Sequence, residues 1–430
     1  MRLPDYFELF ITSLRAANRL MRTIIRSIIE IGMIEIRWLL YGISGFIPRD
    51  KMLWLFGTIR NGFSDNAQHL FIYVSLYRPD IRAVWISGNK DIVSKIENLG
   101  FCAVRRNSAT GFWLALRAKY YFFTHYISDI NFFTSRGSIL VNLWHGSPLK
   151  KIEFDVDCGP SARRCMAPTW RDRYLYCPEV YVRPSFVLSA SRFVSEYALS
   201  SAFRLPVSQC LELGYPRLDL LITHQSEVLR WLDMVGDAPT TYWYSRLSEF
   251  DRVILYLPTW RDSGADVLAA YGIDFETINQ LCSARNSVFA IKLHPFAVPS
   301  GYSEFFRKWS HIILLPTNVE PYALMSIADV LVTDYSSVMF EFILTRRPIV
   351  LHAFDLENFV NLERTFYHLF EEIAIGQVTK SAEELNCAIE ELLTDYPRQN
   401  YEDAVINRYN TFVEGGACER ISKFFLGLSI

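Results

Sequence analysis

DVLVTDYSSVMFEF, residues 329–342, joins a short apolar run to a helical pattern through a polar turn. The first part, VLVT, is typical of a buried strand, and the apolar spacing in SVMFEFIL is typical of a helix. Asp334, Ser336 and Ser337 stand between the two, where side-chain oxygens favour the start of a helix. A strand followed directly by a capped helix is the repeating unit of a parallel α/β sheet.

The same alternation extends over most of the chain. A first series of apolar runs predicts strands at 52–57, 81–87, 120–125, 138–146, 186–191 and 210–216. A second series predicts strands at 252–260, 287–295, 311–316, 329–337 and 348–354. Segments with helical spacing, such as 66–77 and 90–100, lie between the strands of the first series. The pattern indicates parallel sheets flanked by helices.

Two series of strands favour two domains. Residues 217–235 predict one helix, and VGDAPTTYW (235–243) breaks the pattern with Gly, Asp and Pro, as a linker does. We therefore expect an α/β fold of two Rossmann-like, doubly wound domains, at 51–235 and 250–430, with a cleft between them.

Composition excludes some functions. The 430 residues are 50% hydrophobic and carry a formal net charge of −2, which argues against a general nucleic-acid binder. None of the eight cysteines forms a C-x-x-C pair, which favours free thiols in a reducing compartment. The chain also lacks a G-x-G-x-x-G dinucleotide fingerprint.

The first 50 residues predict amphipathic helices. Their longest charge-free run, 38–48, is too short to span a bilayer. Helical spacing gathers a charged stripe on one face, formed by Arg15, Arg19, Arg22, Arg26 and Glu30. Two interpretations stay open: a helix that lies on anionic lipid at a membrane surface, and a helix packed on the domain with its charged face in water.

Four predicted strands end in an unusual polar group. LVNLWHG ends at His145, ILYLPTWRD at Thr259 and Arg261, and FAIKLHP at His294; the fourth strand ends in the DYSS turn. Ligands of open parallel sheets bind outside the carboxyl ends of the strands. Four such endings, distributed over both halves, predict a site between two domains.

The residue types at these ends suit a phosphate. A helix N-terminus offers free N–H groups and a positive dipole, Ser336 and Ser337 add hydroxyls, and the fork of Arg261 matches a phosphate. A helix cap, an ion pair with an acid and a half-buried histidine are the ordinary alternatives. Glu341 lies one turn beyond Ser337, where it could accept hydrogen bonds from a sugar or a polyol. Asp334 is expected to cap the helix, so no metal and no cofactor is predicted.

Five motifs, in this order, resemble the CDP-glycerol glycerophosphotransferase family of teichoic acid primases and polymerases. They are WHGSPLKKIEFD (144–155), GYPRLD (214–219), LPTWRD (257–262), KLHP (292–295) and DVLVTDYSSVMFEF (329–342). The resemblance runs from about residue 52 to the end. It implies a GT-B fold and transfer of glycerol phosphate from CDP-glycerol to a hydroxyl of a lipid-linked or anionic polymer acceptor, with CMP released. It also implies a peripheral enzyme of teichoic acid or capsule synthesis, at the cytoplasmic face of the membrane.

The resemblance also implies roles for residues. His145 takes the position of the general base, and His294 is expected to act with it. The donor and its phosphates are expected to contact Trp144, Gly146, Ser147, Pro148, Arg217, Pro258, Thr259, Arg261, Lys292, Ser336, Ser337 and Glu341. Ser147 replaces the usual Thr and Glu341 the usual Asp, which leaves the polyol open. Lys150 and Lys151 are expected either to hold an anionic acceptor or to form a solvated loop.

Three alternatives remain on the sequence alone. Ribitol phosphate or another polyol phosphate could be the group transferred. A GT-B glycosyltransferase would use a nucleotide sugar and release a different nucleotide. A catalytically silent partner of a polymer-synthesis complex would have no use for His145, His294 and the DYSS turn. The sequence leaves the number of units added, the polymer and the oligomeric state undetermined.

Overall fold

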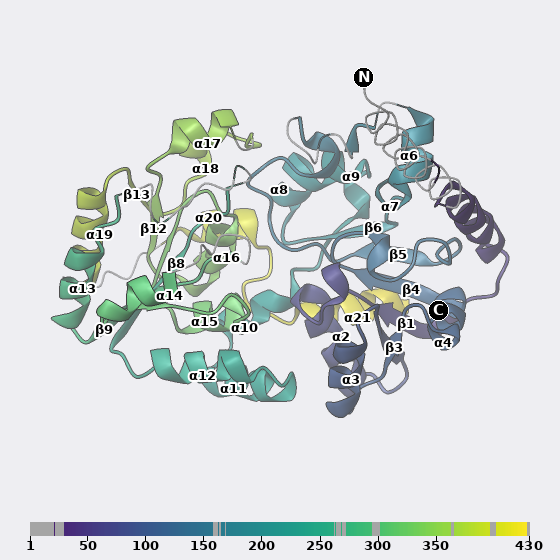
Figure 1. Cartoon of the computed structure of the whole chain (residues 1–430), viewed down its shortest axis with the longest axis horizontal. Coiled ribbons are helices and arrows are strands. Elements are labelled where there is room, and N and C mark those ends of the chain that lie inside the picture. Colours follow the sequence, from purple (N-terminus) through teal and green to yellow (C-terminus); the bar gives the residue numbers. More distant parts are fainter. Residues whose placement is uncertain are drawn as a thin grey trace, which may run out of the picture.

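The computed structural model describes residues 21, 30–157, 162, 165–167, 169–261, 263, 268, 272–294, 302–362, 365–395 and 401–427. Within them lie two parallel sheets, side by side in Figure 1. We call the part of the molecule around the seven-stranded sheet the first half, and the part around the six-stranded sheet the second half.

The first sheet has the order β3-β2-β1-β4-β5-β6-β7, and all its strand pairs are parallel. Its strands are β1 (Asp50–Phe56), β2 (Arg82–Ser87), β3 (Ala103–Arg105), β4 (Ala118–Phe123), β5 (Ile139–Asn142), β6 (Phe186–Ser189) and β7 (Cys210–Glu212). The strand order reverses between β1 and β4, which makes the sheet doubly wound.

The second sheet has the order β10-β9-β8-β11-β12-β13 and is also parallel. Its strands are β8 (Arg252–Leu257), β9 (Ser287–Ile291), β10 (Ile312–Leu314), β11 (Val330–Thr333), β12 (Ile349–His352) and β13 (Gln377–Thr379). Its order reverses between β8 and β11. The TWR and DYSS turns follow these two strands, at the place where a doubly wound sheet opens a crevice.

Helices connect the strands. Those from the start of the chain to the second sheet are α2 (Asp65–Tyr77), α3 (Lys90–Asn98), α4 (Ala109–Arg117), α6 (Trp170–Tyr176), α7 (Pro178–Tyr181), α8 (Arg192–Val194), α9 (Ser200–Phe203), α10 (Asp219–Ile222), α11 (Gln225–Met234) and α12 (Ala238–Leu247). The later ones are α13 (Phe275–Ser283), α14 (Tyr302–Phe305), α15 (Pro321–Ile327), α16 (Val338–Phe342), α17 (Leu356–Leu362), α18 (Phe370–Ile373), α19 (Ala382–Thr394), α20 (Asp403–Tyr409) and α21 (Ala417–Gly427).

The structure confirms the eleven strands predicted from apolar runs and adds two. The additional strands, β3 (AVR) and β13 (QVT), are three-residue edge strands that contain polar residues, so no apolar run marks them in the sequence. The helix expected at 217–235 is divided into α10 and α11, because Thr223 is extended and the side chain of His224 caps the second helix.

The linker predicted at 235–243 is partly helical, because residues 238–247 form α12, and its place between two domains stays a prediction. Asp237 caps this helix by accepting a hydrogen bond from the backbone N of Thr240 at 3.1 Å, and Pro239 lies in its first turn. Asp and Pro interrupt a helical pattern, but they are also favoured residues at a helix start. The sequence pattern was therefore a boundary between two helices.

The end of the chain returns to the first half. The hydroxyl of Tyr120 on β4 donates to the carbonyl of Phe425 on α21 at 3.0 Å, and the Phe425 ring packs on Trp54 and Phe122. Figure 1 shows α21 in yellow among the purple and blue elements of the first half. The C-terminal helix α21 thus packs on the first half. The domain ranges 51–235 and 250–430 stay a prediction.

Candidate active site

The turn after β5 is shaped by its own backbone. The side chain of Asn142 accepts a hydrogen bond from the backbone N of Trp144 at 2.9 Å, and Trp144 adopts a left-handed φ of 50°. Gly146 has a φ of 127°, and a Cβ there would lie 2.7 Å from a carboxylate oxygen of Glu341. Only glycine fits this close approach between the turn and α16.

His145 stands at the top of this turn with an exposed ring. Its Nδ1 lies 3.2 Å from the carbonyl oxygen of Thr124, which can only accept a hydrogen bond. Nδ1 therefore carries the proton, and Nε2 keeps its lone pair. Desolvation by the surrounding protein lowers the pKa of His145, Asp65 opposes this, and Arg217 lowers the pKa further. The ring is consequently neutral at neutral pH and suited to accept a proton.

The other residues of the WHGSP motif support the turn. Trp144 is buried and its ring lies 3.9 Å from that of His145, centroid to centroid. Ser147 and Pro148 are also buried, and the carbonyl of Pro148 accepts a hydrogen bond from Tyr197 at 2.5 Å. The structure places these side chains behind His145. Their predicted contacts with a donor stay a prediction.

Asp334 joins the ends of β8 and β11. One of its oxygens accepts hydrogen bonds from the backbone N of Thr259 at 2.8 Å and of Tyr335 at 2.7 Å. Its other oxygen lies 3.0 Å from Nη2 of Arg261. This carboxylate therefore fixes the two turns relative to each other. The expectation that Asp334 caps the helix is wrong, because Ser337 occupies the cap position of α16.

Arg261 is buried instead of presented to a ligand. Its Nε and Nη2 contact Asp355 at 3.2 and 3.1 Å, and Nη1 donates to the carbonyl of Thr259 at 2.6 Å. Only 1% of the residue is exposed. The ion-pair alternative holds in this structure, with Asp334 and Asp355 as the acids. A contact between Arg261 and a phosphate stays a prediction. It requires Arg261 to bind a phosphate while it is paired with these two carboxylates.

The serines of the DYSS turn are half-buried at the start of α16. The Ser336 hydroxyl accepts a hydrogen bond from the backbone N of Val338 at 3.4 Å, and Ser337 occupies the cap position without a side-chain cap bond. Nearby, Pro258 is buried, and the hydroxyl oxygen of Thr259 is buried without a hydrogen-bond partner. Hydroxyl groups that make no capping hydrogen bond to the helix can donate to a phosphate.

Positive charge gathers around His294, whose ring is exposed. Burial lowers the pKa of His294, and the nearby charges of Lys292, Arg60 and Lys150 lower it further. Lys292 and His294 follow β9 of the second half, whereas Arg60 follows β1 and Lys150 follows the WHG turn of the first half. Cations from both halves therefore face one region, as expected for a site that binds phosphates.

Arg217 and Glu341 contact each other across the two halves. Nη2 of Arg217 lies 3.0 Å from Oε1 of Glu341, and both residues are buried. The carboxylate expected to accept hydroxyls of a polyol is thus already paired with the arginine expected at the donor. The structure brings both residues to the turn that carries His145. Their side chains are buried and paired with each other, so they are not open to a ligand.

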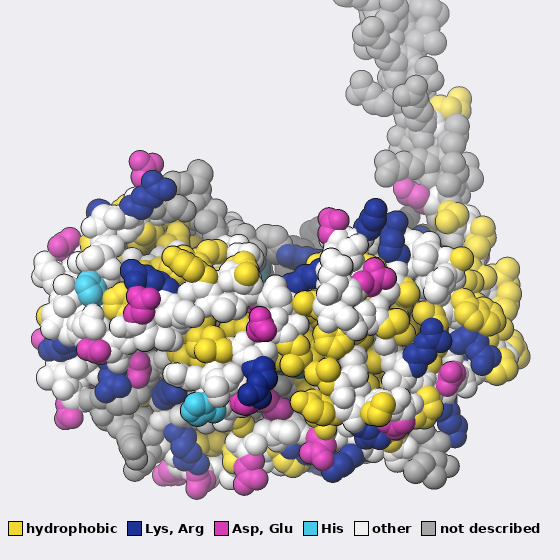
Figure 2. Space-filling view, turned by 90° about the horizontal axis from the view of Figure 1, so that it is seen from below, with side chains coloured by type: hydrophobic (Ala, Val, Ile, Leu, Met, Phe, Trp, Pro, Cys, Tyr) yellow, Lys and Arg dark blue, Asp and Glu magenta, His cyan; other side chains and the backbone are white. Residues whose placement is uncertain are grey.

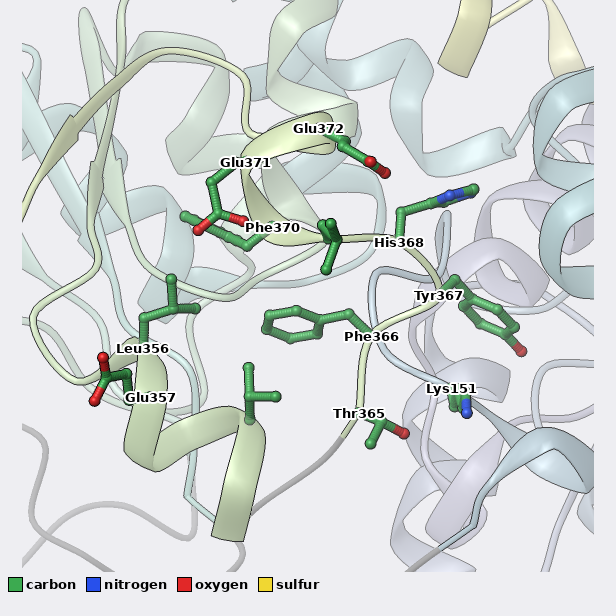
Figure 3. Close-up of a pocket in the computed structure, with 12 residues that line it drawn as sticks. Lys151, Leu356, Glu357, Thr365, Phe366, Tyr367, His368, Phe370, Glu371 and Glu372 are labelled. Atoms are coloured by element: carbon green, nitrogen blue, oxygen red, sulfur yellow. The ribbon is translucent and has the colours of Figure 1, made fainter.

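A separate cavity of about 720 Å³ lies beside the loop that follows His145. Figure 3 shows Leu356, Phe366 and Phe370 on its inner side, with the carboxylates of Glu357 and Glu371 nearby. Its acidic residues do not suit a phosphate. Residues 365–367 of its wall bridge to the first half, because Lys151 N donates to the Thr365 carbonyl at 2.9 Å.

The family is identified by a match of the CDP-glycerol:poly(glycerophosphate) glycerophosphotransferase model to residues 39–427. The chain belongs to this family. It is 26% identical over 420 residues to a teichoic acid poly(glycerol phosphate) polymerase of Bacillus spizizenii, over 92% of this chain and 97% of that one. A teichoic acid glycerol-phosphate transferase of Staphylococcus aureus is 26% identical over 395 residues, which cover 87% of this chain and 92% of the relative.

Solved structures confirm the expected GT-B-like fold. The wall teichoic acid polymerase TagF matches with a TM-score of 0.70 and 22% identity, over 97% of this chain and 98% of that one. A UDP-GlcNAc 2-epimerase of Neisseria meningitidis matches with a TM-score of 0.52 and 12% identity, over 87% of this chain and 99% of the epimerase chain. Because a polymerase and an epimerase share the fold, the fold alone does not decide the reaction.

Several residues of this glycerophosphotransferase-family site were not found from the sequence. Asp355 follows β12, and the strand-end rule that found His294 would have found it too. Asp65 and Asn66 begin α2, where the SDN turn is a helix-start signal. Thr124 and Tyr322 contribute through a carbonyl and a buried hydroxyl, for which the sequence carries no distinctive signal.

Proposed function

We propose that this family member transfers glycerol phosphate from CDP-glycerol to a hydroxyl of a polymer or lipid-linked acceptor and releases CMP in teichoic acid synthesis. The observation that carries the proposal is the arrangement of His145, whose Nδ1 is held by the Thr124 carbonyl at 3.2 Å. This contact leaves Nε2 basic on the exposed side of the ring. A neutral, oriented imidazole is what activation of a hydroxyl requires.

The reaction forms one bond and breaks one. The acceptor oxygen attacks the phosphorus that carries glycerol, His145 Nε2 takes the acceptor proton, and the bond from that phosphorus to the CMP oxygen breaks. Negative charge grows on the phosphoryl oxygens and on the departing CMP. Lys292 and His294 of the second half, with Ser336 and Ser337 at α16, are the groups proposed to stabilise it.

A membrane surface is the proposed location of the acceptor. Residues 30–44 form a helix, and its exposed hydrophobic residues, with Phe46 just beyond, are spaced along one side: Met33, Ile36, Leu39, Ile43 and Phe46. Figure 2 shows hydrophobic side chains gathered at the right edge of the molecule. In the part of the chain that the structure describes, no helix is long and apolar enough to cross a bilayer.

The helix is also anchored to the protein. The indole N of Trp38 donates to the carbonyl of Tyr174 at 2.8 Å, and the two rings stack at 4.8 Å. One side of the helix packs on the first half, and the other leaves an apolar face that we propose contacts lipid. The charged stripe lies outside the described residues except for Glu30.

The activity is tested by incubating the protein with CDP-glycerol, CDP-ribitol or a UDP-sugar and a lipid-linked acceptor. We expect CMP release and acceptor extension with CDP-glycerol. Preference for CDP-ribitol would identify ribitol phosphate as the group transferred. A teichoic acid ribitol-phosphate primase of Bacillus spizizenii is 28% identical over 293 residues, which cover 67% of this chain and 69% of the primase. Release of UDP alone would contradict the proposal, and so would no turnover of any donor.

The location is tested by flotation with liposomes that contain an anionic lipid. The full chain is expected to float with the liposomes, and a variant without residues 1–47 is expected to remain at the bottom. A Leu39→Ser variant should float less, because Leu39 is 64% exposed on the apolar face. Equal flotation of the full and shortened chains would contradict the membrane proposal.

A further inference from the structure

The guanidinium of Arg217 joins three segments at the back of the His145 turn. Nη1 donates to Asp65 Oδ1 at 2.9 Å, and Nη2 donates to the carbonyl oxygen of His145 at 2.6 Å and to Glu341 Oε1 at 3.0 Å. Asp65 begins α2 in the first half, and Glu341 lies on α16 in the second. One side chain therefore contacts the base-bearing turn and both halves.

The pair with Glu341 is closed to solvent. The Glu341 side chain is 1% exposed, its second oxygen accepts a hydrogen bond from the Tyr322 hydroxyl, and the Arg217 guanidinium lies 4.2 Å above the Tyr322 ring. Burial raises the pKa of Glu341, whereas Arg217 lowers it. Burial also opposes the charge on Arg217, but Glu341 and Asp65 hold the pKa of the guanidinium well above its usual range. Its Nε has no hydrogen-bond partner among the residues that the structure describes.

Two residues of the His145 turn contact this ion pair. The carbonyl of His145 accepts from Arg217, and the next residue, Gly146, has no room for a Cβ because Glu341 and Arg217 lie 2.7 and 3.0 Å from its ideal position. A change in the ion pair must therefore move the backbone that carries the imidazole. The ring itself is also held by the Thr124 carbonyl, which lies 3.2 Å from Nδ1.

We propose that Arg217 is a positioning residue for the general base, and that Glu341 is its counter-ion from the opposite half. The pair places Nε2 of His145 only when the two halves are together, so base position is coupled to closure of the site. The inference rests on the proposed function for the role of His145. It replaces the expected role of Arg217 and Glu341 as donor ligands, since their hydrogen-bonding groups are almost all used within the protein.

Arg217 also sets the charge around the base. The charged and titratable groups that face the His145 ring are Arg217, Asp65 from α2 and His125 from the end of β4, whose ring centroid lies 6.2 Å away. Removing the positive charge leaves Asp65 unopposed, which raises the pKa of His145. Lysine at position 217 would keep the charge, but its single ammonium nitrogen lacks the planar fork that contacts Asp65 through Nη1 and Glu341 through Nη2.

The test compares Arg217→Met, Arg217→Lys and Glu341→Gln with the wild-type protein. Arg230→Met is the matched control, because Arg230 is exposed and pairs with Glu227, three residues earlier on the same helix. We expect kcat to fall about 100-fold in Arg217→Met and about tenfold in Arg217→Lys and Glu341→Gln, as for a base displaced by about 1 Å. The KM for CDP-glycerol should change less than about threefold in all of them, while Arg230→Met behaves as wild type.

A second readout does not need turnover. In protein labelled at histidine Cε1, the NMR titration of His145, assigned through His145→Gln, should move to higher pH in Arg217→Met and stay near the wild-type position in Arg217→Lys. Thermal unfolding of each variant distinguishes a protein that does not fold from a folded protein whose His145 ring is displaced. If Arg217→Met does not fold, the fall in kcat of Arg217→Lys and Glu341→Gln decides.

Two results would overturn the inference. One is an unchanged kcat together with an unchanged His145 titration in the folded Arg217 variants. The other is a raised KM or weakened CDP-glycerol binding at unchanged kcat, which would make Arg217 a donor ligand. If the wild-type protein releases no CMP from CDP-glycerol, the proposed function fails instead, and the His145 titration in the Arg217 variants still decides whether the pair positions the ring.

Discussion

The Nδ1 atom of His145 lies 3.2 Å from the carbonyl oxygen of Thr124, which fixes the imidazole as the tautomer with a free Nε2. This contact joins the ends of two neighbouring strands, β4 and β5. It converts an exposed histidine on a buried turn into a group with one defined proton and one defined lone pair. The reaction scheme depends on this relationship more than on any other in the molecule.

The pH dependence of kcat/KM follows from the neutral state of His145. The pKa of His145 is lowered from 6.5, first by desolvation, so the base is neutral and active above that pKa and is lost as the pH falls through it. We expect the acid limb of the profile to lie below pH 6.5. The limb should persist in His294→Gln at a lower overall rate. An acid limb above pH 6.5 would contradict the assignment.

The hydroxyls at the start of α16 are expected to bind the donor. Ser336→Ala combined with Ser337→Ala should weaken CDP-glycerol binding about tenfold or more, because two donors to a charged phosphate are lost. Calorimetric titration with CDP-glycerol measures the change. Ser226→Ala on the exposed start of α11 is the control and should bind normally. Unchanged affinity in the double variant would place the phosphates elsewhere.

Gly146 should tolerate no side chain. Gly146→Ala adds a Cβ 2.7 Å from Glu341 Oε1 at a φ of 127°, so the turn must shift. The strain is about 1–3 kcal/mol and falls on the backbone that carries the base. We expect a loss of kcat much larger than in Gly100→Ala, where φ is 86° but no atom lies within 4 Å of the added Cβ. Equal activity of the two variants would show that the approach to Glu341 is not needed.

Asp355 is expected to contribute to stability through Arg261. Asp355→Ala leaves a buried arginine with one of its two carboxylates, and removing one partner of a buried pair costs about 3–5 kcal/mol. Because Asp334 remains, we expect the lower end of that range in urea unfolding. Asp80→Ala, which breaks an exposed pair with Arg78, should change the unfolding free energy by less than about 1 kcal/mol. Similar losses in both variants would contradict the role of Asp355.

The sequence predicted the positions of the strand ends better than the roles of the residues on them. His145, His294 and the DYSS serines could be found because parallel strands place their carboxyl ends at one edge, a rule that needs only local patterns. The partners of Arg217 and Arg261 could not be found in this way. Asp65 is 152 residues from Arg217, and Asp355 is 94 residues from Arg261. Whether an arginine meets a phosphate or a carboxylate depends on such tertiary contacts.

The most direct test of the account is to measure turnover and donor binding together in His145→Gln. This variant removes the basic nitrogen but keeps a side chain that can contact the Thr124 carbonyl. We expect kcat for CMP release to fall by about 100-fold or more, the usual contribution of a general base, with CDP-glycerol affinity within about threefold of wild type. Turnover within about threefold of wild type would contradict His145 as the base.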